Sequence, residues 1–270
     1  MHWKRWITAL VGLPLLILLV LKGGPTLFAL AIAAVAVIAM WEYFRIVLAE
    51  HSPRVPGYFL LWSYIAGAAV VLVVPYHGFQ AVMALFALHL IGAAAMSILR
   101  YKQSTDAPAV VLKQVFGVLY IAGFLAFFVL LYHDPHGVHW VFFLFVVVAA
   151  GDTGAYYAGR TFGRRKLCPA VSPKKTVEGA LGGLVGSLVL AVAYKLVFMP
   201  FLSLPGCVLF ALLVGSVGQI GDLFESEFKR SAGVKDSSNL LPGHGGFLDR
   251  IDALLFALPV AYLLKEYLLT

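Results

Sequence analysis

Long apolar runs recur along this chain from one end to the other and leave no soluble domain between them. About 17 to 25 apolar residues cross roughly 30 Å of hydrocarbon as an α-helix. With 61% hydrophobic and 12% charged residues, the composition lies outside the range of soluble globular proteins. Since backbone polar groups inside a bilayer must be hydrogen-bonded within the protein, we expect an all-α polytopic integral membrane protein.

We expect nine transmembrane helices, with short turns at Pro25 and Pro75. The second and eighth runs read on into polar helical turns. The nine runs are Trp6–Leu21, Thr26–Leu48, Pro56–Val74, Phe79–Leu99, Val110–Tyr132, Val138–Ala158, Val177–Met199, Pro205–Leu223 and Ile251–Leu269.

Lysine and arginine are distributed unevenly between the loops of this bundle. With the amino terminus inside, seventeen of the twenty basic residues are cytoplasmic, and only Lys22, Lys195 and Lys265 are outside. Because basic loops resist translocation, the pattern predicts a cytoplasmic amino terminus and an external carboxy terminus. The net charge of +7 then describes a basic cytoplasmic face that attracts anionic lipid headgroups and nucleotides. No motif that reads nucleic acid is present.

The two halves of the chain differ in polar content. Residues 1–137 contain little beyond apolar helix, so we expect amino-terminal scaffold helices there. Residues 138–270 carry the polar motifs and are expected to form the catalytic region of one continuous membrane domain. Glu42, Arg45 and His89 are polar at membrane depth in the first half. Interhelical hydrogen bonding or snorkelling explains them, and a role in a site is the alternative.

Asp152 follows an apolar run and opens the segment GDTGAYYAGRTFGRRK. An unpaired carboxylate at mid-helix costs about 3 kcal/mol on insertion scales. Asp152 is therefore expected to face a cavity, a cation or one of Arg160, Arg164 and Arg165. An internal salt bridge explains it as well.

The segment VSPKKTVEG, before the seventh run, has the chemistry of a phosphate site. Ser172 and Thr176 can cap the helix and Glu178 stands in its first turn, while Lys174 and Lys175 add cations near the positive end of the dipole. A plain N-cap with the positive-inside bias accounts for the same residues. The glycine-rich stretch that follows predicts close helix packing rather than a phosphate loop.

The end of the eighth run, GQIGDLFESEFKR, adds further carboxylates. If it stays helical, Asp222 and Ser226 share one face. The Gly-His-Gly-Gly turn before the ninth run can bring backbone N–H groups close to a ligand. Carboxylates from facing helix ends suit Mg²⁺, and Asp222 with Asp249 is the preferred pair. Helix capping is the alternative for Asp249 and Asp252.

Residues 226–252 match a long pattern of fixed spacing. They resemble the signature of bacterial phosphatidate cytidylyltransferases, as do Asp152-Thr-x-Ala155-Tyr156 and Ser172-Pro-Lys-Lys-Thr-x-Glu178-Gly. The resemblance is strong over residues 140–270 and rests on hydropathy and helix count in the amino-terminal half. The matching positions are Ser226-x-Phe228-Lys229-Arg230, Lys235-Asp236 and Leu241-Pro242-x-His244-Gly245-Gly246-Phe247-x-Asp249-Arg250-Ile251-Asp252.

The resemblance implies an enzyme that joins CTP and phosphatidate to give CDP-diacylglycerol and pyrophosphate, with Mg²⁺. Both reactants are anions, and one pair of unit charges about 4 Å apart repels by about 4 kcal/mol at an effective dielectric constant near 20, so cations must offset this repulsion. Asp222 and Asp249 are expected to hold Mg²⁺, and a second cation is left open. Further candidate metal ligands are Ser226, Asp236, Asp252 and Asp152.

The remaining assignments concern the substrates and the reaction. His244 contacts phosphate or hydrogen-bonds its own turn; a phosphomonoester with a second pKa of about 6 is already ionised at neutral pH and needs no strong base. The residues expected at the reacting groups are Asp222, Asp249, Lys229, Arg230 and His244. Phosphate binding is assigned to Ser172, Lys174, Lys175, Thr176, Ser226, Lys235 and Arg250, together with Lys229 and Arg230.

Two other functions fit parts of the pattern. A transporter also has intramembrane acids and glycine-rich helices, although here the acids gather at one interface and no inverted repeat is visible. A kinase that uses CTP to phosphorylate a lipid alcohol would release CDP instead of pyrophosphate. The sequence motif of the CDP-alcohol phosphotransferases is missing.

The expected location is the bacterial inner membrane, with the site at the cytoplasmic face, where CTP arrives from the cytoplasm and the lipid between helices. A small-xxx-small pattern at Gly179 and Gly183 allows a homodimer without requiring one.

This topology can be tested with a reporter fused into the loop between Ser226 and Asp249. The positive-inside pattern predicts a cytoplasmic reporter. A reporter accessible from outside would overturn the topology, and a fusion after Lys195, expected to be external, is the control.

Overall fold

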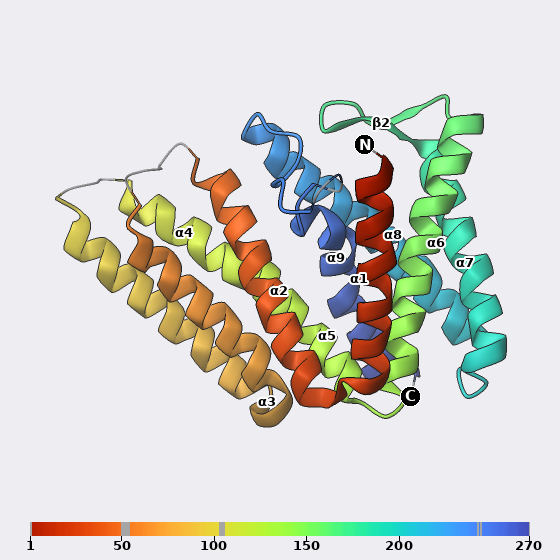
Figure 1. Cartoon of the computed structure of the whole chain (residues 1–270), viewed down its shortest axis with the longest axis horizontal. Helices are drawn as coiled ribbons and strands as arrows, with labels where there is room; N and C mark the ends of the chain where they lie inside the picture. Colours follow the sequence, from red (N-terminus) through yellow and green to blue (C-terminus); the bar gives the residue numbers. More distant parts are fainter. Residues whose placement is uncertain (1, 50–54, 103–105, 242, 244, 270) are drawn as a thin grey trace. The chain divides into compact units, whose positions relative to one another are not determined.

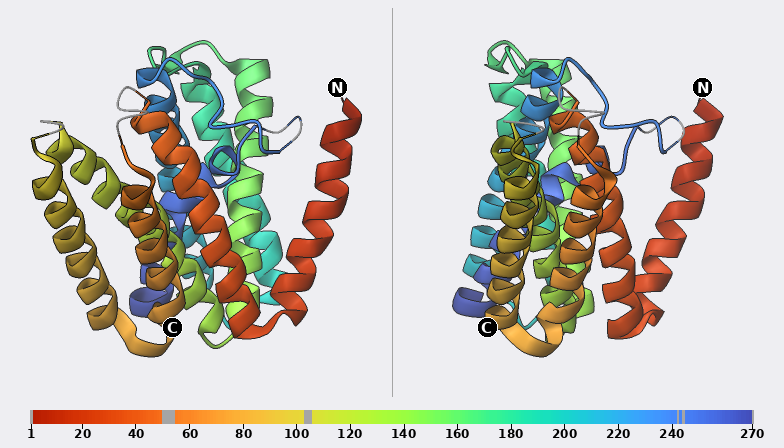
Figure 2. Two further views of the ribbon diagram at one scale, coloured as in Figure 1. Left: turned by 60° about the vertical axis from the view of Figure 1, so that its left-hand side comes forward. Right: turned by 90° about the vertical axis from the view of Figure 1, so that its left-hand side faces the viewer.

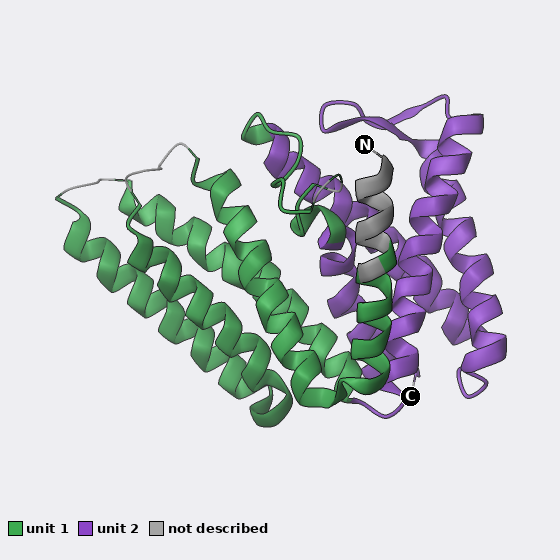
Figure 3. Ribbon diagram, viewed as in Figure 1, with its two compact units in different colours: residues 1–133, 231–250 green, residues 134–230, 251–270 purple. Residues whose placement is uncertain are grey.

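The computed structural model describes residues 2–49, 55–102, 106–241, 243 and 245–269, and the side chains of residues 2–9 and 11 are not described. Two compact units make up the chain (Figure 3). Unit 1 contains residues 1–133 and 231–250, and unit 2 contains residues 134–230 and 251–270. Residues 232–247, which connect α8 (Leu204–Ser231) to α9 (Leu248–Leu264) and are called the signature loop below, therefore cluster with the amino-terminal helices.

Unit 1 is a helical bundle. Its helices α2, α3, α4 and α5 contact one another, and Figures 1 and 2 show them running side by side. α4, η1 and α5 follow one another without a break, with a π-helical stretch in the middle. The elements are α1 (His2–Lys22), α2 (Gly24–Val47), α3 (Gly57–Arg100), α4 (Ala107–Gly117), η1 (Val118–Gly123) and α5 (Phe124–His133).

The third and fourth predicted runs form the two arms of α3, and the turn between them differs from the prediction. Pro75 lies inside the helix, and the chain instead bends at Gly78, whose φ is 67° and ψ is −168°. A residue without Cβ adopts a positive φ without strain, which explains why glycine makes the break. Trp62 Nε1 donates to the His89 carbonyl oxygen at 3.1 Å and joins the two arms. Pro25 stands in the first turn of α2, where its missing N–H costs nothing.

Unit 2 is built from helices and one small hairpin. The strands β1 and β2 pair antiparallel, with Lys166 opposite Thr176 and Cys168 opposite Ser172. This hairpin was not predicted from the sequence, and the assignment of Ser172 as a helix cap was wrong, because Ser172 begins a strand. The elements are α6 (Gly137–Phe162), β1 (Lys166–Cys168), β2 (Ser172–Thr176), α7 (Val177–Phe198), most of α8 (Leu204–Ser231), most of α9 (Leu248–Leu264) and η2 (Lys265–Leu269).

The contact between α6 and α7 depends on glycine, as the sequence predicts. A Cβ at Gly154 would lie 2.5 Å from the Gly182 carbonyl oxygen, and one at Gly186 would lie 2.7 Å from the Ala150 oxygen. Helix backbones can approach this closely only where side chains are absent. Gly179 and Gly183 also face α6 of the same chain, so this pattern serves packing within the chain. The homodimer stays a prediction.

The structure confirms an all-α polytopic membrane protein. Over the described residues, six helices are long and apolar enough to cross a membrane: α2, α3, α4 to α5 as one span, α6, α7 and α8. The kinked α3 accounts for two predicted runs. The first and ninth runs correspond to α1 and to α9 with η2. The count of nine spans and the orientation of the termini stay predictions.

The glycine contact predicts the effect of a substitution on stability. A Cβ at Gly182 would collide with Ala158 Cβ and lie 3.2 Å from the Gly154 oxygen, so Gly182→Leu should lower the free energy of unfolding by about 2–3 kcal/mol. The measurement is unfolding in detergent micelles. Gly57→Leu is the control, because a Cβ there meets nothing within 4 Å, and the change should stay within about 0.5 kcal/mol. Equal effects of the two substitutions would contradict the packing argument.

Candidate active site

Unit 2 contains a pocket of about 410 Å³ that is lined by α6, β2 and α8. From α6, Asp152 and Arg160 line this pocket about two helical turns apart. The pocket is thus a recess with a largely apolar wall and several charged side chains, and Asp152 lines it, which is one of the environments that the sequence predicts for this residue. Its charged lining residues are Asp152, Arg160, Lys174, Lys175 and Asp222.

An ion pair crosses this pocket. Lys175 Nζ lies 2.5 Å from Asp222 Oδ2, and the two side chains are 28% and 33% exposed. The pairing joins a cation that can bind phosphate to a carboxylate that can bind Mg²⁺. The sequence assigned these two roles separately, and the structure brings them to one place.

The hairpin that carries Lys175 is fixed at both ends. Thr176 Oγ1 accepts a hydrogen bond from the Gly179 N–H at 3.1 Å and caps α7, as predicted. Glu178 accepts from the backbone N–H groups of Arg164 and Arg165 at 3.0 and 3.1 Å, which ties the loop after α6 to the start of α7. Arg230 Nε donates to the Val171 carbonyl oxygen at 3.2 Å, so the end of α8 holds the hairpin turn.

A third carboxylate approaches Asp222 from α9. A Cβ at Gly221 would lie 2.7 Å from the Asp252 carbonyl oxygen, so glycine allows α8 and α9 to lie close together. The Asp252 carboxylate is within electrostatic range of Asp222 and Asp152, with Lys229 as a balancing cation. Oxygen donors of this kind suit Mg²⁺.

A cage of protein ligands is not formed by these acids. Among the described residues, no three His, Cys, Asp or Glu side chains lie close enough to hold a metal ion. A Mg²⁺ ion that binds together with substrate phosphates needs only one or two protein carboxylates, because phosphate and water supply the rest. The donor set therefore fits an ion that arrives with a phosphate.

The last turns of α8 contain a buried ion pair. Lys229 contacts Glu225 one turn earlier, and the two residues are 8% and 0% exposed. Ser226, between them, is also buried, whereas Arg230 is exposed. Part of the charge of Lys229 is thus neutralised within the helix, while Arg230 stays accessible to an anion.

In unit 1, two carboxylates hold the signature loop. Asp249 Oδ2 accepts from the Ser237 N–H at 3.0 Å, the Ser237 hydroxyl at 3.1 Å and the Gly246 N–H at 2.8 Å. Glu42 accepts from the backbone N–H groups of Phe247 and Leu248. The tight glycine turn is present, with φ of 80° at Gly243 and Gly245. The expectation that backbone N–H groups of this turn lie close to a ligand was wrong for Gly246, whose N–H donates to Asp249. For the rest of the turn it stays a prediction.

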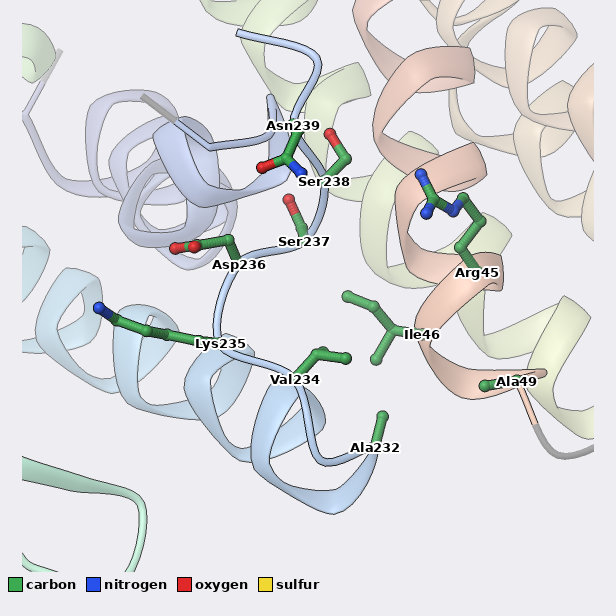
Figure 4. A pocket seen from close by; sticks show the side chains of 10 residues that line it. All are labelled: Arg45, Ile46, Ala49, Ala232, Val234, Lys235, Asp236, Ser237, Ser238 and Asn239. Carbon is green, nitrogen blue, oxygen red and sulfur yellow. The ribbon is translucent and has the colours of Figure 1, made fainter. Parts of the chain in front are cut away.

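A second pocket lies between this loop and α2. It has a volume of about 520 Å³ and includes Asp236 and Asn239 from the loop. Figure 4 shows the cations Arg45 and Lys235 on opposite sides of it. The Arg45 guanidinium stands 4.8 Å from the Trp41 ring centroid, which fixes the Arg45 side chain beside the pocket. Two cations and one acid give this pocket a lining that suits an anionic polar group.

Comparisons with known proteins place this arrangement in a family. The model of the Cytidylyltransferase family matches residues 3–268. The chain belongs to this cytidylyltransferase family. It is therefore a membrane-bound nucleotidyltransferase that uses CTP.

Several relatives carry one name, phosphatidate cytidylyltransferase. The protein of Haemophilus influenzae is 34% identical over 279 residues, which cover 95% of this chain and 96% of the relative. That of Staphylococcus haemolyticus is 35% identical over 265 residues, 96% and 97% of the two chains. That of Bacillus subtilis is 48% identical over 134 residues, about half of each chain (48% and 49%).

The site residues predicted from the sequence are distributed over both units. Asp152, Lys174, Lys175 and Asp222 share the first pocket, and Lys235 with Asp236 lines the second. The pairing of Asp222 with Asp249 stays a prediction. Arg250 is exposed at the start of α9, and His244 lies outside the described residues.

Glu42 in the amino-terminal half contacts the signature loop, which was not predicted from the sequence. Interhelical hydrogen bonding was the preferred explanation for Glu42, and hydrogen bonding is what the structure shows. Its partners, however, belong to the signature loop. Gln219, which lines the first pocket and donates to the Ala180 oxygen at 3.1 Å, was not singled out either. A polar residue near the end of an apolar run is the signal that both share.

The Lys175–Asp222 pair should contribute little to stability. In a double-mutant cycle with Lys175→Met and Asp222→Asn, the coupling energy should be at most about 1 kcal/mol, because both groups are partly exposed. The measurement is the free energy of unfolding in detergent micelles. Breaking the buried Glu225–Lys229 pair with Lys229→Met should cost about 3 kcal/mol or more. A coupling of that size at Lys175 and Asp222 would mark this pair as structural.

Proposed function

We propose that this protein is a phosphatidate cytidylyltransferase, which converts CTP and phosphatidate to CDP-diacylglycerol and pyrophosphate. The observation that carries the proposal is the Lys175–Asp222 pair in a pocket lined by further cations. A reaction between two anions needs positive charge at the reacting phosphates and an acid that can hold a metal ion. Relatives that match almost the whole chain carry this name.

In the proposed reaction, a phosphate oxygen of phosphatidate attacks the α-phosphorus of CTP. The new bond joins this oxygen to the α-phosphorus, and the bond from the α-phosphorus to the bridging oxygen breaks, so pyrophosphate leaves. No proton must be removed from an ionised phosphate. The cations of the first pocket, Lys174, Lys175 and Arg160, bind phosphate oxygens and offset the repulsion between the substrates.

Mg²⁺ is the expected cofactor. Asp222 would hold it, together with Asp249 as the preferred second ligand and Asp252 or Asp152 as further candidates. When bound, it supplies positive charge to the phosphates and to the leaving pyrophosphate. A second cation is left open.

The remaining basic residues are proposed to hold the substrates. Arg230 is exposed at the end of α8, and Arg45 with Lys235 lines the second pocket. Arginine is suited to bidentate phosphate contacts. The site is proposed to face the cytoplasm at the inner membrane, since CTP is soluble while the diacyl chains enter from the bilayer.

The reaction can be tested by following CTP turnover by the purified protein in micelles. Release of pyrophosphate should require phosphatidate and Mg²⁺, and Asp222→Asn should lower the rate by about 100-fold or more. Glu227→Gln is the matched control, because Glu227 is exposed on the same helix and should leave the rate unchanged.

Other products would overturn the proposal. Release of CDP would indicate a lipid-alcohol kinase. Ion flux in liposomes without CTP turnover would indicate a transporter. A rate that is equal with and without phosphatidate would exclude this lipid as the second substrate.

A further inference from the structure

Glu42 is a fully buried carboxylate on α2, with 0% of the residue exposed. Four donors surround it. Oε1 accepts from the Ser238 hydroxyl at 2.5 Å and from the Phe247 N–H at 3.0 Å. Oε2 accepts from the Ser237 hydroxyl at 3.1 Å and from the Leu248 N–H at 2.6 Å. Each oxygen thus takes one hydroxyl and one backbone N–H.

These donors come from the two ends of one loop. Ser237 and Ser238 lie before the glycine turn, whereas Phe247 and Leu248 lie after it, where α9 begins. A single carboxylate therefore fixes the distance between the two ends of the loop. A buried carboxylate is tolerated when it is fully hydrogen-bonded, so this contact is specific in geometry.

Asp249, in the first turn of α9, binds the same loop. Its Oδ2 accepts from the N–H groups of Ser237 and Gly246, and the single hydroxyl proton of Ser237 is shared between Glu42 and Asp249. At Gly246 there is no room for a side chain, because a Cβ would collide with the Ser237 hydroxyl and the Glu42 carboxylate. The orientation of Asp249 is therefore set by a hydrogen-bond network that also includes Glu42.

We propose that Glu42 is a positioning residue for the cytidylyltransfer reaction. It holds the signature loop closed and orients Asp249 without touching the reacting groups itself. This inference rests on the proposed function. It assigns part of the site to the amino-terminal helices, of which α2 also lines the second pocket with Arg45, Ile46 and Ala49.

Glu42→Gln is the sharpest test, because it preserves size and removes one acceptor. The hydroxyls of Ser237 and Ser238 can rotate to accept from an amide, but a backbone N–H cannot accept. Whichever way the amide turns, its NH₂ group faces the N–H of Phe247 or Leu248. The hydrogen bond from the Phe247 or the Leu248 N–H should be lost, while α2 stays helical.

The test combines hydrogen exchange with kinetics in micelles. In Glu42→Gln the amides of Phe247 and Leu248 should exchange faster, and kcat should fall by about 100-fold, the scale of a misplacement of about 1 Å. KM for CTP should change less than kcat, because none of the first-pocket cations, Lys174, Lys175 and Arg160, is among the groups that Glu42 binds. Glu227→Gln makes the same chemical change at an exposed position and should alter neither readout.

A milder variant covers the case in which Glu42→Gln does not fold. Ser238→Ala removes one hydroxyl donor and leaves the Phe247 N–H bonded to Oε1. It should raise exchange at residues 237–248 and lower kcat by about threefold to tenfold, in line with the loss of one hydrogen bond to a charged group.

The outcomes separate this inference from the proposed function. Wild-type turnover with unchanged kcat and unchanged exchange in both variants would overturn the positioning role. Lower thermal stability with normal kcat per folded molecule would also overturn it, because a purely structural anchor behaves in this way. If the wild type releases no pyrophosphate, the proposed function fails and the catalytic role of Glu42 fails with it. Faster exchange in Glu42→Gln would then still establish the loop closure alone.

Discussion

Carboxylates buried close to a membrane are the constraint on which the rest of this structure depends. Each of them needs donors or a cation, because an unsatisfied charge in a poorly hydrated region is costly. Glu42 takes four hydrogen-bond donors from the signature loop and the first residue of α9, and Glu225 contacts Lys229. The requirement for partners therefore holds the signature loop against α2 and pairs two residues in the last turns of α8.

Glycine makes room for that arrangement. Glycines allow α6 to contact α7 closely. The hairpin directly precedes α7, where Thr176 caps the helix and Lys175 contacts Asp222. The same principle applies where Gly221 lets α9 approach α8 and where Gly246 leaves space for the Glu42 carboxylate. Small residues contribute no chemistry of their own here, but the positions of charged groups depend on them.

The long apolar helices were predictable from the length and hydropathy of their sequence segments, because the thickness of a bilayer sets how many apolar residues a spanning helix needs. The errors concern local geometry. Pro75 was taken as a turn although a helix tolerates it there, while the bend lies at Gly78, where a positive φ is required. The hairpin of Ser172 is too short to give a clear alternating pattern. The role of Glu42 could not be read from local sequence, since its partners stand far away along the chain.

That separation has a consequence for how the protein is made. Glu42 and its loop partners are 195 to 206 residues apart in sequence, so α2 leaves the ribosome long before the donors that satisfy its carboxylate. Closure of the signature loop is therefore a late event in biogenesis, and a chain that stops short of Leu248 lacks the contacts that complete it.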